Sequence, residues 1–374
     1  MKVVYYWSPF LTKIATIKSV YNSAISLTKY SEKYKAIIIN VCGEWTREKK
    51  ILEANSISCI DLVSFNYHKY LPKRGYFFSR FSLFVIALIS FIPLIILLLK
   101  KKPNFFIIHL NSILPIFFSN FFFNTKFILR ISGFPKLHFL RKFLWKSFSK
   151  NLFKVISPTF GTKEILTRNK IFRHKNVEVI RDPVLVLKNI KSFKKSESKQ
   201  LLAIGRLTKQ KNFHFLIKCF YQLNLLYPNE YKLVILGEGE DKKKLENLIS
   251  ILKLEKQVKL LGYKKNIEDY FSNSCCFVLS SLWEDPGFVL IESSIYETVI
   301  ISSNCESGPK ELIEDNNNGL LYENNNVDDF VRVFNKFRIL SEEKKKLMKI
   351  NAKKSVRKYT LFFHGKALEA LLNN

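Results

Sequence analysis

Short apolar runs alternate with helix-length segments along most of this chain. In the first half, stretches long enough to form helices separate the runs KVVYYW, YKAIIIN, FFIIHL and KFILRIS. Strands that are apolar throughout are typical of parallel βαβ units, because helices cover both faces of a parallel sheet. The pattern stops in a polar, lysine-rich stretch and resumes with LLAIG, KLVILG, QVKLLG and CCFVLSS.

This alternation predicts an α/β protein with two doubly wound, Rossmann-like domains that face a central cleft. A length of 374 residues suits two domains of ordinary size. We expect an N-terminal domain at 1–183, a linker at 184–200 and a C-terminal domain at 201–355. The last segment, 356–374, is predicted to form a helix that packs back toward the N-terminal domain. Ligands of such folds bind at the carboxyl ends of the strands, so site residues are expected in the loops that follow them.

One segment, residues 81–99, is long and apolar enough to be considered as a membrane span. Its sequence FSLFVIALISFIPLIILLL contains no charged residue, and Arg80 and Lys100 flank it. A span would cut one α/β layer in half, because the segment runs straight into the strand-like KPNFFIIHL. A buried core helix and a helix on a membrane surface remain open alternatives.

The segment PKLHFLRKFLWKSFSKNLFKV has the periodicity of an amphipathic helix. One stripe is basic and another is apolar, as in a helix that rests on an anionic lipid leaflet. An ordinary domain helix with solvated lysines has the same pattern. The basic stripe contains Lys142, Lys146 and Lys150, and the apolar stripe contains Leu140, Phe143, Leu144 and Phe148.

The chain is strongly basic, with 61 Lys and Arg against 31 Asp and Glu and a formal net charge of +30. Such a charge attracts nucleotides, nucleic acid or an acidic membrane leaflet, although many lysines can simply be solvated. The six cysteines form no Cys-x-x-Cys pair, which argues against a zinc site. The start MKVVYYWSPF lacks the layout of a signal peptide, and we therefore expect a reducing, cytoplasmic location.

Candidate chemistry gathers in the loops of the second half. In LLAIGRLTKQKN, a strand ends near Gly205, and Arg206 and Lys211 follow; these two cations can clamp a diphosphate. In KLVILGEGED, the two glycines resemble half of a dinucleotide fingerprint, but a tight strand-to-helix turn explains them better. In VKLLGYKKN, Gly262 and Tyr263 follow the next strand and can flank a flat base.

The stretch SLWEDPGFVLIES joins a predicted strand to a helix that begins near Gly287. The unpaired amides at the start of a helix bind phosphate; here they belong to Gly287, Phe288, Val289 and Leu290. Glu284 precedes this anion site, and Glu292 lies within the helix. Carboxylates accept hydrogen bonds from paired sugar hydroxyls, so one glutamate can hold a ribose and the other a hexose. Alternatively, each is an acid that complements the helix dipole.

Taken in order, five segments resemble family-4 glycosyltransferases of the GT-B fold: GRLTKQKN, GEGEDKKKLENL, LGYKKN, WEDPGFVLIES and SSNCESGPKELIEDNNNGLLY. The resemblance is strong in the second half, and SPFLTKIATIKS and RISGFPKLHFLRKFLWK extend it loosely into the first. It implies that Arg206 and Lys211 bind the donor diphosphate, that Glu284 contacts the transferred sugar and that Glu292 contacts the ribose. Transfer in this family usually retains anomeric configuration and needs no metal, in keeping with the absence of an Asp-x-Asp motif.

The N-terminal half departs from the family pattern in one place and matches it in another. The usual glycine-rich loop after the first strand is replaced by WSPFLTKIAT. His109 in FFIIHLNS matches the family's N-domain histidine, which implies a catalytic role, and Asn111 follows two positions later. A histidine at the end of a strand is also often structural.

The subset that the sequence most resembles builds O-antigen, capsule and related lipid-linked glycans. It implies a UDP- or GDP-linked sugar as donor, a polyprenyl-diphosphate-linked glycan as acceptor, no cofactor, and peripheral attachment to the anionic inner face of the plasma membrane. One alternative is a basic nucleic-acid-binding protein, but no recognised module is present and we expect no nucleic-acid partner. Another is a nucleotide-sugar epimerase or a phosphorylase on a similar scaffold.

Overall fold

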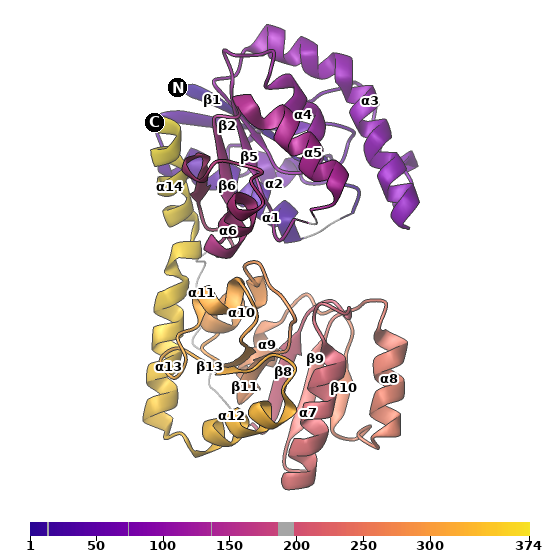
Figure 1. Cartoon of the computed structure of the whole chain (residues 1–374), viewed down its shortest axis with the longest axis vertical. Helices are drawn as coiled ribbons and strands as arrows, with labels where there is room; N and C mark the ends of the chain where they lie inside the picture. Colours follow the sequence, from indigo (N-terminus) through magenta and orange to yellow (C-terminus); the bar gives the residue numbers. More distant parts are fainter. Residues whose placement is uncertain (13–14, 74, 136, 186–197) are drawn as a thin grey trace. The chain divides into compact units, whose positions relative to one another are not determined.

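The computed structural model describes residues 1–12, 15–73, 75–135, 137–185 and 198–374, and it divides into two compact units (Figure 1). The N-terminal unit comprises Met1–Val186 together with Tyr359–Asn374, and the C-terminal unit comprises Leu187–Lys358. Most of the predicted linker lies outside the described residues. Both units contain a parallel sheet covered by helices, which confirms the predicted pair of doubly wound α/β domains.

The sheet of the N-terminal unit has the strand order β3-β2-β1-β4-β5-β6-β7 in its described part. The chain reverses its winding direction between β1 and β4, which are hydrogen-bonded neighbours. The central strands are almost wholly apolar, and all four residues of β4 are buried. The strands are β1 (Lys2–Trp7), β2 (Tyr34–Asn40), β3 (Ser58–Asp61), β4 (Phe105–Ile108), β5 (Lys126–Arg130), β6 (Lys154–Ser157) and β7 (Val177–Val179).

Helices cover both faces of this sheet and enclose two apolar cores. The last helix of the chain packs along α1 and so belongs to this unit. The α-helices are α1 (Ala15–Tyr30), α2 (Lys49–Glu53), α3 (Tyr76–Lys101), α4 (Ile113–Phe118), α5 (Phe139–Phe148), α6 (Phe160–Arg168) and α14 (Leu361–Asn373), with 3-10 turns at His68–Tyr70, Ser149–Asn151 and His174–Asn176. A further 3-10 turn, Val356–Tyr359, precedes α14 where the chain passes from the C-terminal to the N-terminal unit.

The long apolar helix α3 packs on the core along one face and leaves the other face open. It is the one helix in the described part of the chain that is long and apolar enough to cross a membrane, and 28% of its most apolar window is buried. It is therefore not enclosed within the unit. The buried apolar residues are Ile86, Leu94, Leu97 and Leu98, whereas the exposed ones are Phe77, Phe78, Phe81, Phe84, Leu88, Phe91, Ile92, Ile96 and Leu99.

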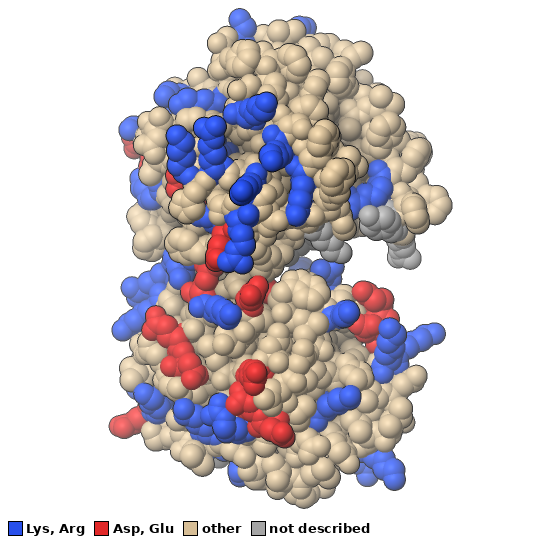
Figure 2. All heavy atoms as spheres, in the orientation of Figure 1, with Lys and Arg blue, Asp and Glu red and all other residues tan. Residues whose placement is uncertain are grey.

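Helix α5 presents a second exposed apolar surface in the same unit. Phe139, Leu140 and Phe143 are exposed, whereas Leu144 and Phe148 are partly buried, so the predicted apolar stripe does not form one outward face. Lysine and arginine side chains gather on the visible face around α5 and α6, while the outer edge along α3 carries few charges (Figure 2).

The C-terminal unit has the strand order β10-β9-β8-β11-β12-β13, and its winding direction reverses between β8 and β11. One apolar core lies between the sheet and the helices on one of its faces, and apolar residues of the other face, among them Phe277, Ile300 and Leu290, are buried as well. The strands are β8 (Gln200–Ile204), β9 (Lys232–Leu236), β10 (Val258–Leu260), β11 (Cys276–Leu279), β12 (Val299–Ser303) and β13 (Leu320–Tyr322). The helices are α7 (Phe213–Leu226), α8 (Lys242–Ile251), α9 (Glu268–Ser272), α10 (Phe288–Ile295), α11 (Gly308–Leu312), α12 (Val327–Ile339) and α13 (Glu342–Ser355).

Candidate functional site

The switch point of the C-terminal unit brings two of the predicted site residues into contact. The loop after β8 carries Lys211, the loop after β11 carries Glu284, and their side chains form an ion pair. The Lys211 side chain is 13% exposed and that of Glu284 is 6% exposed. The Ser281 hydroxyl donates a second hydrogen bond to the same carboxylate oxygen at 2.6 Å. The pair is thus a buried charged element exactly where open α/β sheets bind ligands.

Hydrogen bonds between the two loops hold this pair in place. The Ser280 hydroxyl donates to the Lys211 carbonyl at 2.8 Å, and the Leu282 amide donates to the Gln210 carbonyl at 2.8 Å. A third loop, after β12, joins them through the Gly308 amide, which donates to the Glu284 carbonyl at 3.0 Å. Because backbone groups make most of these contacts, the positions of both charged side chains are determined by the loop conformations.

Close approach of the strand-end turns explains two glycines near the pair. A Cβ on Gly205 would lie 2.8 Å from Cε of Lys211, whose side chain crosses over this residue. Gly237 has φ +142°, and a Cβ there would lie 1.8 Å from the Gly205 carbonyl oxygen. The Gly237 amide also donates to the Gly262 carbonyl at 2.9 Å. The GEGE segment therefore forms a tight turn that packs against its neighbours, as the sequence favoured.

Helix α10 begins beside the ion pair. Gly287 is its N-cap residue with φ +86°, and no side chain caps the helix. A Cβ on Gly287 would lie 3.5 Å from Cβ of Glu284, so the helix start and the carboxylate are neighbours. The amide of Leu290 donates to the Gly287 carbonyl at 3.0 Å and is used within the first turn. The amides of Phe288 and Val289 come before the first hydrogen bond within the helix, as is usual for the first residues of a helix.

The remaining predicted donor-binding residues lie on the strand ends and on α10 near this centre. Arg206 and Tyr263 are exposed at the ends of β8 and β10, and Gly262 lies in the turn beside Gly237. Glu292 is partly buried on α10, eight residues beyond Glu284. In the described part of the chain, no hydrogen bond or ion pair joins Arg206 or Tyr263 to Lys211 or Glu284.

In the N-terminal unit, His109 follows β4 at the switch point with β1. Its amide donates to the Trp7 carbonyl at 2.9 Å, and its ring stacks on that of Tyr6 with centroids 5.9 Å apart. The residue is 5% exposed, and neither ring nitrogen has a hydrogen-bond partner among the described residues. Burial lowers the pKa of His109 well below its usual value, and the Arg130 guanidinium lowers it further. The ring is therefore neutral, with one N–H donor and one acceptor nitrogen.

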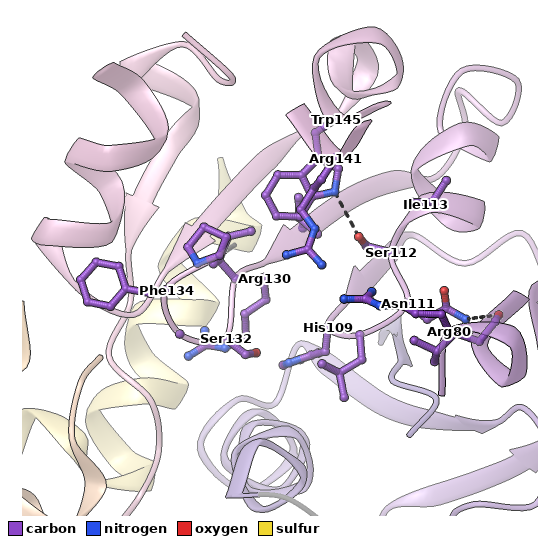
Figure 3. Close-up of a pocket in the computed structure, with 16 residues that line it drawn as sticks. Arg80, His109, Asn111, Ser112, Ile113, Arg130, Ser132, Phe134, Arg141 and Trp145 are labelled. Atoms are coloured by element: carbon purple, nitrogen blue, oxygen red, sulfur yellow. Dashed lines mark hydrogen bonds between the residues drawn. The ribbon is translucent and has the colours of Figure 1, made fainter. Parts of the chain in front are cut away.

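His109 lines a cavity of about 230 Å³ (Figure 3). The cavity walls come from α3, from the loops after β4 and β5, and from α5. Three arginines reach it from three elements: Arg80 from α3, Arg130 from the end of β5 and Arg141 from α5. The sequence analysis assigned no role to these arginines, because the residues next to each of them in the sequence do not show that the three elements meet in the folded chain.

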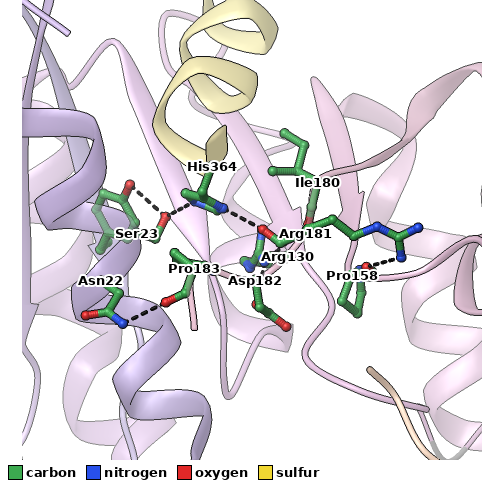
Figure 4. A network of polar contacts seen from close by, with 10 residues as sticks. Asn22, Ser23, Arg130, Pro158, Ile180, Arg181, Asp182, Pro183 and His364 are labelled. Carbon is green, nitrogen blue, oxygen red and sulfur yellow. Dashed lines mark hydrogen bonds and ion pairs between the residues drawn. The ribbon is translucent and has the colours of Figure 1, made fainter. Parts of the chain in front are cut away.

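One wall of this cavity is fixed from behind by a buried polar network (Figure 4). The Arg130 guanidinium donates to the Asp182 carboxylate, and both side chains are almost fully buried. His364 of α14 contacts the Arg181 carbonyl through Nδ1 at 2.7 Å and the Ser23 hydroxyl of α1 through Nε2 at 2.8 Å. These contacts tie the end of the chain to the segment after β7, whose Asp182 holds Arg130.

Comparison with known proteins identifies the C-terminal unit. Residues 187–355 match the family of glycosyl transferases group 1. An uncharacterized glycosyltransferase of Methanocaldococcus jannaschii is 36% identical over 57% of this chain and 58% of its own length. A Campylobacter jejuni N-acetylgalactosamine-N,N'-diacetylbacillosaminyl-diphospho-undecaprenol 4-alpha-N-acetylgalactosaminyltransferase is 36% identical over 40% of this chain and 39% of its own length. The chain therefore spans less than two thirds of the relatives that it matches.

Solved structures show the same fold over the whole chain. A glycosyltransferase from Rickettsia africae superimposes with a TM-score of 0.74 at 19% identity, covering 100% of this chain and 98% of that one. Anabaena HepE, solved in complex with UDP, superimposes with a TM-score of 0.73 at 14% identity and covers 100% of both chains. Together with the two parallel-sheet units, these matches show that the chain has the fold of these solved glycosyltransferases, and that its C-terminal unit is similar to the glycosyl transferases of group 1.

Proposed function

We propose that the protein transfers a sugar from a nucleotide-sugar donor to a lipid-linked glycan during the synthesis of a surface polysaccharide. The observation that carries this proposal is the buried Lys211–Glu284 pair beside the start of α10, in the part of the chain that matches the family. Two relatives support the biological setting through their names: the undecaprenol-dependent transferase of Campylobacter jejuni and the amylovoran biosynthesis glycosyltransferase of Erwinia amylovora.

The donor diphosphate would bind at the start of α10 and be held by Lys211 and Arg206. Helix-start amides and a buried cation stabilise the negative charge that develops on the departing nucleotide diphosphate. Glu284 would accept hydrogen bonds from the transferred sugar, and Glu292 from the ribose. The base would lie near Gly262 and Tyr263. Little covalent chemistry is required, because stabilising the leaving group and aligning the acceptor supply most of the rate enhancement.

His109 of the N-terminal unit would take part in catalysis. Its buried, neutral ring has a donor and an acceptor without partners among the described residues, so it can bind a sugar hydroxyl without adding charge. We also propose that transfer retains anomeric configuration and needs neither a metal nor a cofactor, as the family resemblance and the missing Asp-x-Asp motif indicate. Full activity in excess EDTA and an α-linked product from an α-linked donor are the expected results.

The acceptor would be presented at the cytoplasmic face of the membrane, where the protein would attach peripherally. Helix α3 exposes a row of phenylalanines and leucines, and α5 adds Phe139, Leu140 and Phe143. Lys146 and Lys150 are exposed near these apolar residues. Exposed apolar side chains combined with lysines suit an anionic lipid surface, because the apolar groups insert while the cations contact headgroups.

The test is transfer from a panel of UDP- and GDP-linked sugars to polyprenyl-diphosphate glycans extracted from membranes. We expect one donor to be used, and we expect Glu284→Gln to lower turnover by about 100-fold or more. The matched control is Glu246→Gln, which removes an exposed carboxylate of α8 in the same unit and should leave turnover unchanged. Absence of both transfer and binding for every nucleotide sugar would refute the proposal.

A further inference from the structure

The arginine-lined cavity of the N-terminal unit has a composition that donor binding does not explain. Its 16 lining residues include Arg80, Arg130 and Arg141, and none of them is an aspartate or a glutamate. Figure 3 shows the side chains of Arg80 and Arg141 directed into the cavity from α3 and α5. Arg130 is already paired with Asp182 behind the cavity wall, whereas Arg80 and Arg141 bring two further positive charges to a cavity that has no acidic lining residue, and this composition favours an anionic ligand.

Several buried polar atoms at this cavity lack partners within the described part of the chain. They are Nε of Arg130 and the hydroxyl of Ser132, in addition to the two ring nitrogens of His109, for which a sugar hydroxyl is proposed above. His109 and Arg130 are 5% and 1% exposed. A buried polar group without a partner destabilises the folded protein, so several of them in one place are typical of a site that is completed by a ligand.

We infer that this cavity binds the diphosphate group of the lipid-linked acceptor, an assignment that rests on the proposed function. Arginine is suited to this ligand because its planar guanidinium forms paired hydrogen bonds with phosphate oxygens. The volume of about 230 Å³ is smaller than the roughly 300–1,000 Å³ of pockets that enclose a whole drug-sized ligand. The cavity therefore accommodates a head group and leaves the rest of the acceptor outside.

The surroundings of the cavity distinguish a lipid diphosphate from free phosphate. Arg80 and Arg141 belong to α3 and α5, and both of these helices also carry exposed phenylalanines. On α3, Phe77, Phe81 and Phe84 are exposed near Arg80 in sequence. A prenyl chain attached to a diphosphate between these helices has apolar surface beside it, whereas free pyrophosphate would make no use of that surface.

Binding to the intact protein tests the inference without requiring sugar transfer. Titration calorimetry would compare three probes: farnesyl diphosphate, inorganic pyrophosphate and farnesol. We expect farnesyl diphosphate to bind most tightly, and pyrophosphate to bind more weakly and compete with it. Arg80→Gln and Arg141→Gln should each weaken farnesyl diphosphate binding by about 10- to 100-fold. The matched control is Arg173→Gln, which removes an exposed arginine of the same unit that does not line the cavity.

Each outcome decides the inference. Binding that neither Arg80→Gln nor Arg141→Gln weakens would overturn it, as would absence of binding to both diphosphates. Equal affinity for pyrophosphate and farnesyl diphosphate would assign the cavity to free phosphate and overturn the lipid assignment. Nucleotide-sugar binding by the same variants is measured in parallel and should not change. If the wild-type protein binds no nucleotide sugar, the proposed function is contradicted. Binding of farnesyl diphosphate would still test the cavity in that case, because it does not depend on the donor.

Discussion

The buried ion pair between Lys211 and Glu284 leads to a quantitative prediction about the stability of the C-terminal unit. We consider Lys211→Met, which removes the cation and keeps an apolar side chain of similar length, and Glu284→Gln, which removes the negative charge and keeps an acceptor oxygen. The double variant removes both charges. If the two charges stabilise each other inside the protein, the double variant should lose less free energy of unfolding than the two single variants lose in sum.

The magnitude follows from burial and from the partners that remain. In Lys211→Met, a carboxylate that is 6% exposed keeps the Ser281 hydroxyl at 2.6 Å as its remaining side-chain donor. Breaking a buried pair in this way typically costs about 3–5 kcal/mol. Glu284→Gln should cost less, about 2 kcal/mol, because the amide oxygen still accepts a hydrogen bond from the ammonium. The double variant leaves no charge and should show a coupling energy of about 2–3 kcal/mol.

The assay should report on the C-terminal unit separately from the rest of the chain. Hydrogen exchange of peptides from β11 and β12, followed by mass spectrometry, gives the opening free energy of that sheet. Calorimetry provides a second measure, with an expected shift of about 2–4 °C for each kcal/mol in a unit of this size. The matched control is Lys199→Met, since Lys199 pairs with Glu230 in the same unit while being 58% exposed. An exposed pair of this kind should contribute at most about 1 kcal/mol.

Two results would refute this reasoning. Additive effects in the double variant would show that the two charges do not depend on one another. A cost for Lys211→Met no greater than that of Lys199→Met would show that burial does not strengthen the pair. Loss of sugar transfer without loss of stability would leave a catalytic role for Lys211 but would contradict the energetic role described here.

Three further predictions concern other parts of the molecule. Burial lowers the pKa of His364 from its usual 6.5 to about 3, so below pH 6.5 the unfolded chain binds more protons than the folded one. Urea unfolding should therefore show about 1.6 kcal/mol of stability lost as the pH falls from 6.5 to 5, and His364→Gln should abolish this component. Gly237→Ala should destabilise the C-terminal unit by about 3 kcal/mol or more in hydrogen exchange, because its Cβ would overlap a carbonyl oxygen; unchanged exchange would contradict this. Replacing both Phe84 and Leu88 with Ser should lower the affinity of the protein for anionic vesicles, measured by co-sedimentation, at least about tenfold. Ile251→Ser, at an exposed site of the other unit, should leave this affinity unchanged.

Much of the C-terminal site could be predicted from the sequence because its signals are local. The apolar runs show where each parallel strand ends, and parallel strands present their carboxyl ends at one edge of the sheet. The loops that carry Lys211 and Glu284 could therefore be placed on the same edge before the structure was known. The turn at Gly237 was also predictable, since a tight strand-to-helix connection favours glycine.

The tertiary structure decided which of these side chains meet. Lys211 and Glu284 are 73 residues apart, and their contact depends on β8 and β11 being neighbours in the sheet. The cavity depends on the same kind of information, because Arg80, Arg130 and Arg141 come from separate elements that pack around the end of β4. Local periodicity specifies strands and helices, whereas strand order and helix packing arise from the burial of apolar surface over the whole chain. The sequence by itself therefore determined the class of fold and the position of the loops that carry Lys211 and Glu284, and only the folded chain determined the ion pair, the open face of α3 and the arginine cavity.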